Sequence, residues 1–259
     1  MSETLKDKKI KNRHVIVAGA GPNLKKYWDR IKKFVDEENA ITIGCNFICD
    51  VFVPDYHFWG TNKRWNKYGE GMNEGPTLVF PHGQSKKIVR KYWKGSFETY
   101  DTDVRVHKSH RKKPDIYHCF ENVALVSILY AYQRGASRIS IVGMDGYSFY
   151  SKEELAKMEK SQHCYSKGFS DMEDKPKYAG ENQIDINYAR GRKKDIFNYK
   201  NLKKLAKYGK KKYGFELEII TPTVYKSFYN SDILNIQEKY NGKSPSPKEK
   251  TELYKILGI

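Results

Sequence analysis

Uncharged polar side chains stand at the ends of three apolar segments, and their types suit them to bind a nucleotide. Asn46 ends the segment 41–46, Asn62 follows a segment rich in aromatic residues, and Tyr147 follows the segment 138–142. An asparagine amide offers a donor and an acceptor together, which matches a base edge or a ribose, and a tyrosine hydroxyl can donate to a phosphate oxygen. If the three segments are parallel strands of one sheet, these side chains converge on one crevice.

A glycine turn follows the apolar segment 14–18. Gly19 and Gly21 allow the backbone to turn sharply and to approach a ligand closely. Pro22 suits the first position of a helix, where its missing N–H would be unpaired in any case. Strand, glycine turn and helix form an arrangement in which free N–H groups and the positive helix end face an anion. We therefore expect ligand binding by the turn residues Gly19, Ala20, Gly21, Pro22 and Asn23.

This turn does not match two familiar nucleotide motifs. A dinucleotide fingerprint needs a small residue where Leu24 stands, and an acidic residue where Asn46 stands, so NAD is not expected. The Gly-Lys-Ser/Thr that ends a Walker motif does not follow the turn either. A tight strand–helix turn that binds no ligand remains the simplest alternative.

A second glycine turn follows the segment 138–142 and would face the same crevice. It begins at Gly143 and carries Asp145, which either accepts hydrogen bonds from backbone amides of the turn or contacts the ligand. Tyr147 and Tyr150 come next and can reach a phosphate through their hydroxyls. The two turns together predict a single ligand crevice.

The elements that position these residues alternate between strand and helix patterns. Asn122 is placed to cap an apolar helix that Gly135 ends, and His57 is expected to pack in the core rather than to catalyse. The alternation predicts an α/β fold, a Rossmann-like open and mostly parallel sheet with helices on both faces. The expected strands lie within residues 14–18, 41–46, 51–60, 77–81, 138–142 and 215–220.

The chain is predicted to form one domain, residues 13–240. A mobile basic arm is expected before it at residues 1–12, and a linker with a C-terminal helix after it at residues 241–259. Residues 151–192 are poor in apolar side chains and are predicted to form a lid over the crevice. His163 is the only histidine of this segment and is the candidate general base.

The composition is strongly basic, with a formal net charge of +17, and it indicates anionic partners such as nucleotides, phosphorylated glycans, anionic lipid or nucleic acid. A long helix is predicted over residues 195–213, and nine lysines between positions 193 and 212 give it an exposed basic face. The four cysteines fit neither a disulfide framework nor a zinc site. Without a membrane-length apolar run or a signal-peptide pattern, we expect a cytoplasmic protein, with at most peripheral contact to an anionic membrane.

One acidic pair matches a metal-binding pattern. Asp101 and Asp103 lie in the charged, irregular stretch 99–114 and resemble the two-aspartate signature with which many nucleotide-sugar transferases hold a divalent ion. The basic run 107–113 follows closely and either receives an anionic acceptor or is simply solvated. We expect no metal at the nucleotide site.

The glycine turns and asparagines resemble those of the bacterial family 42 sialyltransferases. With Pro54 and Asp55, the same pattern also resembles the motility accessory factors and the archaeal hydroxymethylpterin pyrophosphokinase-like proteins. The resemblance covers roughly residues 13–150 and 215–223, and it is carried by residues 15–24, 45–46, 62 and 141–147. It implies a Rossmann-like domain that binds CMP-sialic acid without a metal.

The resemblance also implies roles for single residues. Asn46 matches a donor-binding asparagine of the family and Asn62 a further one, while Tyr147 matches the first phosphate-binding tyrosine and Tyr150, more loosely, the second. A lid histidine is the general base of the family, which implies this role for His163 although it comes earlier in the chain.

Two positions depart from the family pattern. Ala20 replaces the asparagine of the first turn, with Asn23 nearby, and Asn122 stands near the place where the family begins a helix with Thr-Ser-Gly. These departures concern the identity of the sugar donor more than the nucleotide fold.

The residues and the resemblance together predict a glycosyltransferase that moves a sialic-acid-like sugar from a CMP-activated donor to a glycan or lipid-linked glycan, without a further cofactor. A lid base would deprotonate the acceptor hydroxyl, and tyrosine hydroxyls and basic groups would stabilise the departing phosphate. A magnesium-dependent pyrophosphokinase of the hydroxymethylpterin type is the first alternative and would need clustered acids. A basic nucleic-acid-binding protein is the second, although no specific nucleic-acid motif is present.

Overall fold

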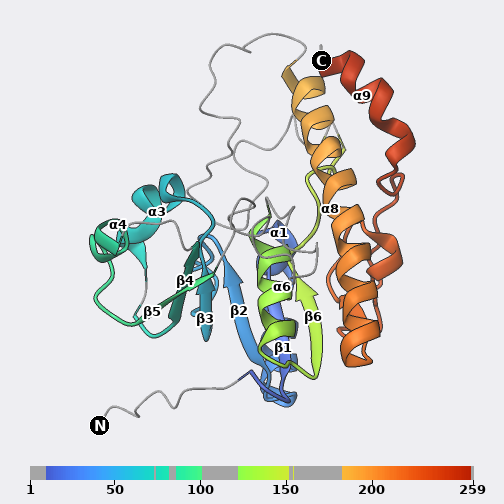
Figure 1. The fold of residues 1–259 in the computed structure, drawn as a ribbon. Helices are drawn as coiled ribbons and strands as arrows, with labels where there is room; N and C mark the ends of the chain where they lie inside the picture. The colour runs from blue at the N-terminus through green and yellow to red at the C-terminus, as the bar shows by residue number, and fades with distance from the viewer. Residues whose placement is uncertain are drawn as a thin grey trace.

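The fold is a seven-stranded, all-parallel sheet with helices on both faces, shown by a computed structural model that describes residues 10–72, 74–81, 86–100, 122–151, 154 and 183–257 (Figure 1). The strands are β1 (His14–Ala18), β2 (Ile41–Cys45), β3 (Tyr56–Phe58), β4 (Thr77–Pro81), β5 (Phe97–Tyr100), β6 (Arg138–Val142) and β7 (Leu217–Ile219). The predicted Rossmann-like α/β class is confirmed.

The strand order is β5-β4-β3-β2-β1-β6-β7, so that β1 lies between β2 and β6. Val17 of β1 is in register with Ile43 of β2 on one side and with Ile141 of β6 on the other. The chain builds the sheet outward from β1 to β5 and then returns to the other side of β1. In open α/β sheets, the crevice at such a switch point, beyond the carboxyl ends of the strands, is where ligands bind.

Alternating side chains of β1 divide the core into two layers. Val15 and Val17 pack with the layer that contains the helices 123–133 and 183–213, whereas Ile16 and Ala18 pack with the layer that contains the helices between residues 22 and 90. The helices are α1 (Pro22–Lys26), α2 (Trp28–Glu37), α3 (Asn62–Tyr68), α4 (Lys86–Arg90), α6 (Val123–Gln133), α8 (Gln183–Tyr213) and α9 (Lys250–Leu257). In the described part of the chain, no helix combines the length and apolar character that a membrane span requires.

Helix α6 is buried over nearly its whole length because it lies between the sheet and α8. Its start is as predicted, since the side chain of Asn122 accepts a hydrogen bond of 2.9 Å from the N–H of Ala124. Its end is also as predicted, because Gly135 follows with a φ of +80°, a conformation that favours glycine.

Three predicted boundaries are wrong. Residues 10–12 are not part of a mobile arm, because Ile10 is buried in the core and the N–H of Asn12 donates to the carbonyl of Gly135. Residues 183–192 are not lid, because they form the beginning of α8. Residues 99–100 do not belong to an irregular stretch, because β5 extends to Tyr100.

Several predictions fall outside the described residues. These are residues 1–9 of the arm, the lid residues 152–153 and 155–182 with His163, and the stretch with Asp101 and Asp103. The predicted C-terminal helix is present as α9, and it packs on α8 through a small apolar cluster of Leu253 with Ala189 and Ile196.

Substituting Gly143 with Ala will test how tightly the two glycine turns are packed. Gly143 has a φ of +61°, and a Cβ there would lie 2.5 Å from the carbonyl oxygen of Gly19. Strain and overlap together should lower the free energy of unfolding by about 3–5 kcal/mol, measured by urea denaturation. Gly214 is the matched control, because it has a φ of +79° but no atom within 4 Å of a Cβ, so that Gly214→Ala should cost only about 1–2 kcal/mol. Equal losses in the two variants would contradict the packing argument.

Candidate functional site

A pocket of about 80 Å³ lies at the switch point of the sheet, where the turns after β1, β2 and β6 meet. Helices α6 and α8 complete its wall. It is lined by Gly19, Ala20, Gly21, Cys45, Asn46, Asn122, Ala124, Gly143, Met144, Asp145, Gly146, Tyr147, Asn198 and Tyr225. Except for Asp145, the polar side chains among these residues are amides, hydroxyls and one thiol, which can orient a ligand by hydrogen bonds.

Most of the predicted site residues come together here. The tertiary structure brings Gly19, Ala20, Gly21, Asn46, Asn122, Gly143, Asp145 and Tyr147 to the pocket wall. Four others, Pro22, Asn23, Asn62 and Tyr150, are not among the lining residues. His163 lies outside the described residues.

The first glycine turn does not present the free amides that the sequence suggests. The N–H of Gly19 donates to the carbonyl of Val142, and the N–H of Gly21 donates to the carbonyl of Gly143, both at 2.8 Å. The N–H of Asn23, in the first turn of α1, donates to Oδ2 of Asp145 at 2.8 Å. The N–H groups of Gly19, Gly21 and Asn23 thus bind other parts of the chain, with the carboxyl group of Asp145 at the start of α1.

Direct contact between the two turns explains the glycines of the first one. A Cβ at Gly21 would lie 2.6 Å from Cγ of Asp145, and a Cβ at Gly19 would lie 2.6 Å from the carbonyl oxygen of Gly143. Both distances are too short for a side chain. The glycines thus allow the second turn, rather than a ligand, to approach the backbone.

Asn23 also has a structural role. Its side chain is buried, and its Nδ2 donates at 2.9 Å to the carbonyl of Pro222 beyond β7. Both the backbone N–H and the side-chain amide of Asn23 therefore bind other parts of the chain.

Asp145 is buried at the floor of the pocket with only one of its carboxyl oxygens paired. Oδ2 accepts from Asn23, whereas Oδ1 has no hydrogen-bond partner among the described residues. Burial raises the pKa of Asp145 to about 7, and the hydrogen bond from Asn23 opposes this rise only in part. The backbone contact expected for this residue is present, and Oδ1, the unpaired oxygen, is buried against Gly21.

Asn46 is held in place by its backbone. It has a φ of +59°, its N–H donates to the carbonyl of Phe58 at 2.8 Å, and its carbonyl accepts a hydrogen bond from Nε2 of His57. Its side-chain Oδ1 is buried and has no partner within the described part of the chain. Asn46 therefore lines the pocket and carries an acceptor that the described residues leave unused.

His57 is a core residue, as predicted. It is fully buried and stacks on Trp59 with ring centroids 5.3 Å apart. Burial lowers the pKa of His57 to about 4, so that the ring is neutral at physiological pH and its Nε2–H can donate to Asn46. His57 acts on the pocket only by fixing the backbone of Asn46.

Helix α8 supplies a clamp on the second turn that sequence reasoning missed. Oδ1 of Asp195 accepts from the N–H of Tyr147 at 2.9 Å and from the hydroxyl of Tyr225 at 3.0 Å. Its Oδ2 accepts from the N–H and the hydroxyl of Ser148 at 2.8 and 2.6 Å. Asn198, one helical turn later, lines the pocket and donates to the hydroxyl of Tyr225 at 3.3 Å. Asp195 is the single acid within the predicted helix 195–213, and that was the available signal.

Tyr147 and Tyr150 occupy different surroundings. The ring of Tyr147 lies beneath the ammonium group of Lys194, 4.8 Å from the ring centroid. Tyr150 is half-buried, and burial together with the negative charge of Asp145 raises its pKa, which keeps its hydroxyl protonated. Tyr147 thus combines a pocket position with a neighbouring cation.

Asn62 begins α3 behind Thr61, whose side chain caps the helix by accepting from the N–H of Arg64 at 3.3 Å. Its Oδ1 is buried without a partner in the described ranges, outside the pocket wall. The convergence of Asn62 with Asn46 on one pocket is therefore not observed.

Groups of three or more histidine, cysteine or acidic residues that could hold a metal are absent from the described residues. Asp101 and Asp103 lie outside them. No protein-family model matches the chain, and no curated protein matches it either. The fold and the pocket are therefore the features that indicate a function.

The buried carboxyl of Asp145 predicts a pH dependence of stability. Because its pKa is raised to about 7 in the folded state, the folded chain binds an extra proton between about pH 4 and pH 7, and this contribution to stability is lost as the pH rises through that range. Asp145→Asn removes the titrating group but keeps an oxygen that can accept from Asn23. Between pH 4 and pH 8, its free energy of unfolding should gain about 2–4 kcal/mol relative to that of the unsubstituted chain. Parallel pH profiles from urea denaturation would contradict this prediction.

Proposed function

We propose that the chain is a glycosyltransferase that binds a CMP-activated, sialic-acid-like sugar and transfers it to a glycan or lipid-linked glycan. One observation carries the proposal. Asn46, whose buried Oδ1 has no partner in the described part of the chain, lines a pocket at the switch point of the sheet, directly after β2. An NAD-binding fold has a carboxylate at this position, whereas a neutral amide suits a ligand with both donors and acceptors.

The backbone N–H groups of Gly19 and Gly21 in the first turn are already paired. We therefore infer that side chains bind the donor phosphate. Asp145 occupies the start of α1 and would repel a phosphate there. The cation available beside the pocket is Lys194, over the ring of Tyr147. We place the donor phosphate at this second turn, where the Tyr147 hydroxyl and Lys194 would stabilise its charge as the sugar leaves.

The acceptor hydroxyl needs a base, for which we propose His163, in the segment outside the described residues. Tyr150 is proposed to assist with the phosphate, because its raised pKa keeps the hydroxyl a donor. We also propose that the protein is cytoplasmic and makes peripheral contact with a membrane that carries the acceptor. No further cofactor is required by this reaction.

A magnesium-dependent pyrophosphokinase is the second candidate. The observation that favours it is the unpartnered carboxyl oxygen of Asp145 in the pocket, because such transfer needs acidic ligands for magnesium. Further acids would have to come from Asp101 and Asp103, which lie outside the described residues.

A thermal-shift panel separates the two candidates. CMP, UDP, GDP, ATP and S-adenosylmethionine are added separately, each with EDTA and with magnesium. At a hundredfold excess over its Kd, CMP should add about 2.7 kcal/mol and raise the Tm by roughly 5–10 °C, with or without magnesium. Stabilisation by magnesium and ATP alone would replace the glycosyltransferase proposal with the pyrophosphokinase.

Removing the Asn46 side chain should weaken CMP binding. Asn46→Gly is preferred to alanine because the left-handed backbone at this position favours glycine. The loss of hydrogen bonds to the ligand should cost about 1–3 kcal/mol of binding free energy, measured by calorimetry. Asn39→Gly is the matched control, since Asn39 has a φ of 44° and precedes the opposite end of β2. An unchanged Kd in Asn46→Gly would remove Asn46 from the site.

A further inference from the structure

The outward face of α8 is a straight stripe of lysines that contains one phenylalanine. All nine lysines between positions 193 and 212 are exposed. Six side chains recur at spacings of four and three residues and so lie on one face of the helix, over about 27 Å. This lysine stripe consists of Lys193, Phe197, Lys200, Lys204, Lys207 and Lys211.

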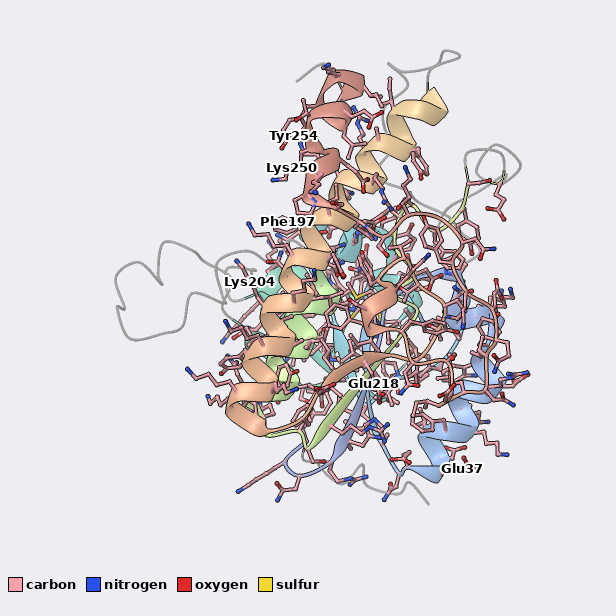
Figure 2. The ribbon with its side chains drawn as sticks, turned by 90° about the vertical axis from the view of Figure 1, so that its right-hand side faces the viewer. Glu37, Phe197, Lys204, Glu218, Lys250 and Tyr254 are labelled. Carbon is pink, nitrogen blue, oxygen red and sulfur yellow. The ribbon has the colours of Figure 1, made fainter. Side chains whose placement is uncertain are left out.

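Helix α9 extends the same surface. Figure 2 shows Phe197 and Lys204 on α8 along the same side of the molecule as Lys250 and Tyr254 on α9. The ammonium group of Lys193 lies 4.8 Å from the ring centroid of Tyr254, which joins the two helices at this surface. The aromatic side chains therefore gather at the amino-terminal half of the stripe.

The positive charge of the stripe is not neutralised within the described part of the chain. Between residues 193 and 213 the only acid is Asp195, which is buried and faces the pocket side of α8. Lys210 pairs with Glu216 at 2.6 Å but stands outside the stripe. No ion pair joins Lys200, Lys204, Lys207 or Lys211 to an acid among the described residues.

The side-chain chemistry favours one class of partner. A row of lysines without arginine attracts diffuse negative charge, whereas specific recognition of single phosphates usually employs the bidentate arginine fork. Phe197 keeps 36% of its surface exposed between the lysines, and an apolar ring in that position gains free energy at the boundary between headgroups and acyl chains. We propose that the lysine stripe, with Tyr254, is a docking surface for an anionic lipid membrane.

This surface is linked to the pocket by the helix itself. Lys194 and Asp195 adjoin the stripe in sequence and contact Tyr147 of the second turn. Docking through α8 would thus hold the pocket beside the membrane. The docking surface rests on the peripheral membrane contact of the proposed function, but lipid binding is measured separately from CMP binding and transfer.

The test is co-sedimentation of the full chain with vesicles of phosphatidylcholine, with and without about one third phosphatidylserine. The chain should bind the anionic vesicles and not the neutral ones. Substituting Lys200, Lys204, Lys207 and Lys211 with Gln should weaken binding about fivefold for each lysine, or roughly several hundredfold in all. Phe197→Ser should weaken binding at high salt, where the electrostatic attraction is screened.

A matched control removes the same charge elsewhere. Lys32 and Lys33 on α2 and Lys86 and Lys87 on α4 are also exposed, and changing these four to Gln should leave binding to anionic vesicles nearly intact. Equal losses in the two quadruple variants would show a mere net-charge effect and overturn the proposal.

Tighter binding of a duplex RNA than of the vesicles, lost in the stripe variant alone, would overturn the proposal in favour of nucleic acid. A circular dichroism melt confirms that each variant is folded, and CMP binding reports on the proposed function separately.

Discussion

The contact between the two glycine turns is the constraint on which the rest of the pocket depends. The N–H of Gly21 donates to the carbonyl of Gly143, and the carboxyl of Asp145 accepts from the N–H of Asn23. These bonds join the carboxyl ends of β1 and β6 on the two sides of the switch point. The approach is so close that side chains are excluded at Gly19 and Gly21. The first turn therefore lines the pocket with a backbone whose N–H groups at Gly19 and Gly21 are already paired.

Two buried acids organise a strongly basic chain. Asp145 links the turns, and Asp195 accepts hydrogen bonds from Tyr147, Ser148 and Tyr225. Burial raises the pKa of both carboxyl groups, so each costs free energy to ionise, and hydrogen bonds offset that cost. The lysines of the stripe lie on the opposite, exposed side of α8. The same helix thus presents Asp195 inward to the pocket and the lysine stripe outward.

Local patterns were enough to predict most of the elements. Apolar runs mark β1, β2, β4 and β6 because strands covered on both faces need such side chains. The cap of α6 by Asn122 is a hydrogen bond to the nearby Ala124, so it can be predicted from neighbouring residues in the sequence. The start of α8 was missed, because residues 183–192 carry few apolar side chains and gain their helical state from packing. Ala189 there is buried against Leu253 of α9, a contact that no local pattern contains.

The sequence by itself determined the α/β class, the two glycine turns and most of the side chains that line the pocket, because parallel strands bring their carboxyl ends to one edge. Only the tertiary structure decided what those side chains do. In the folded chain, the backbone N–H of Asn23 donates to the carboxyl group of Asp145, and the side-chain amide of Asn23 donates to the carbonyl of Pro222. The tertiary structure also carried Asp195 and Asn198 from a basic helix to the pocket. These outcomes depend on contacts between residues up to 199 positions apart, and such contacts leave no periodic signal in the chain.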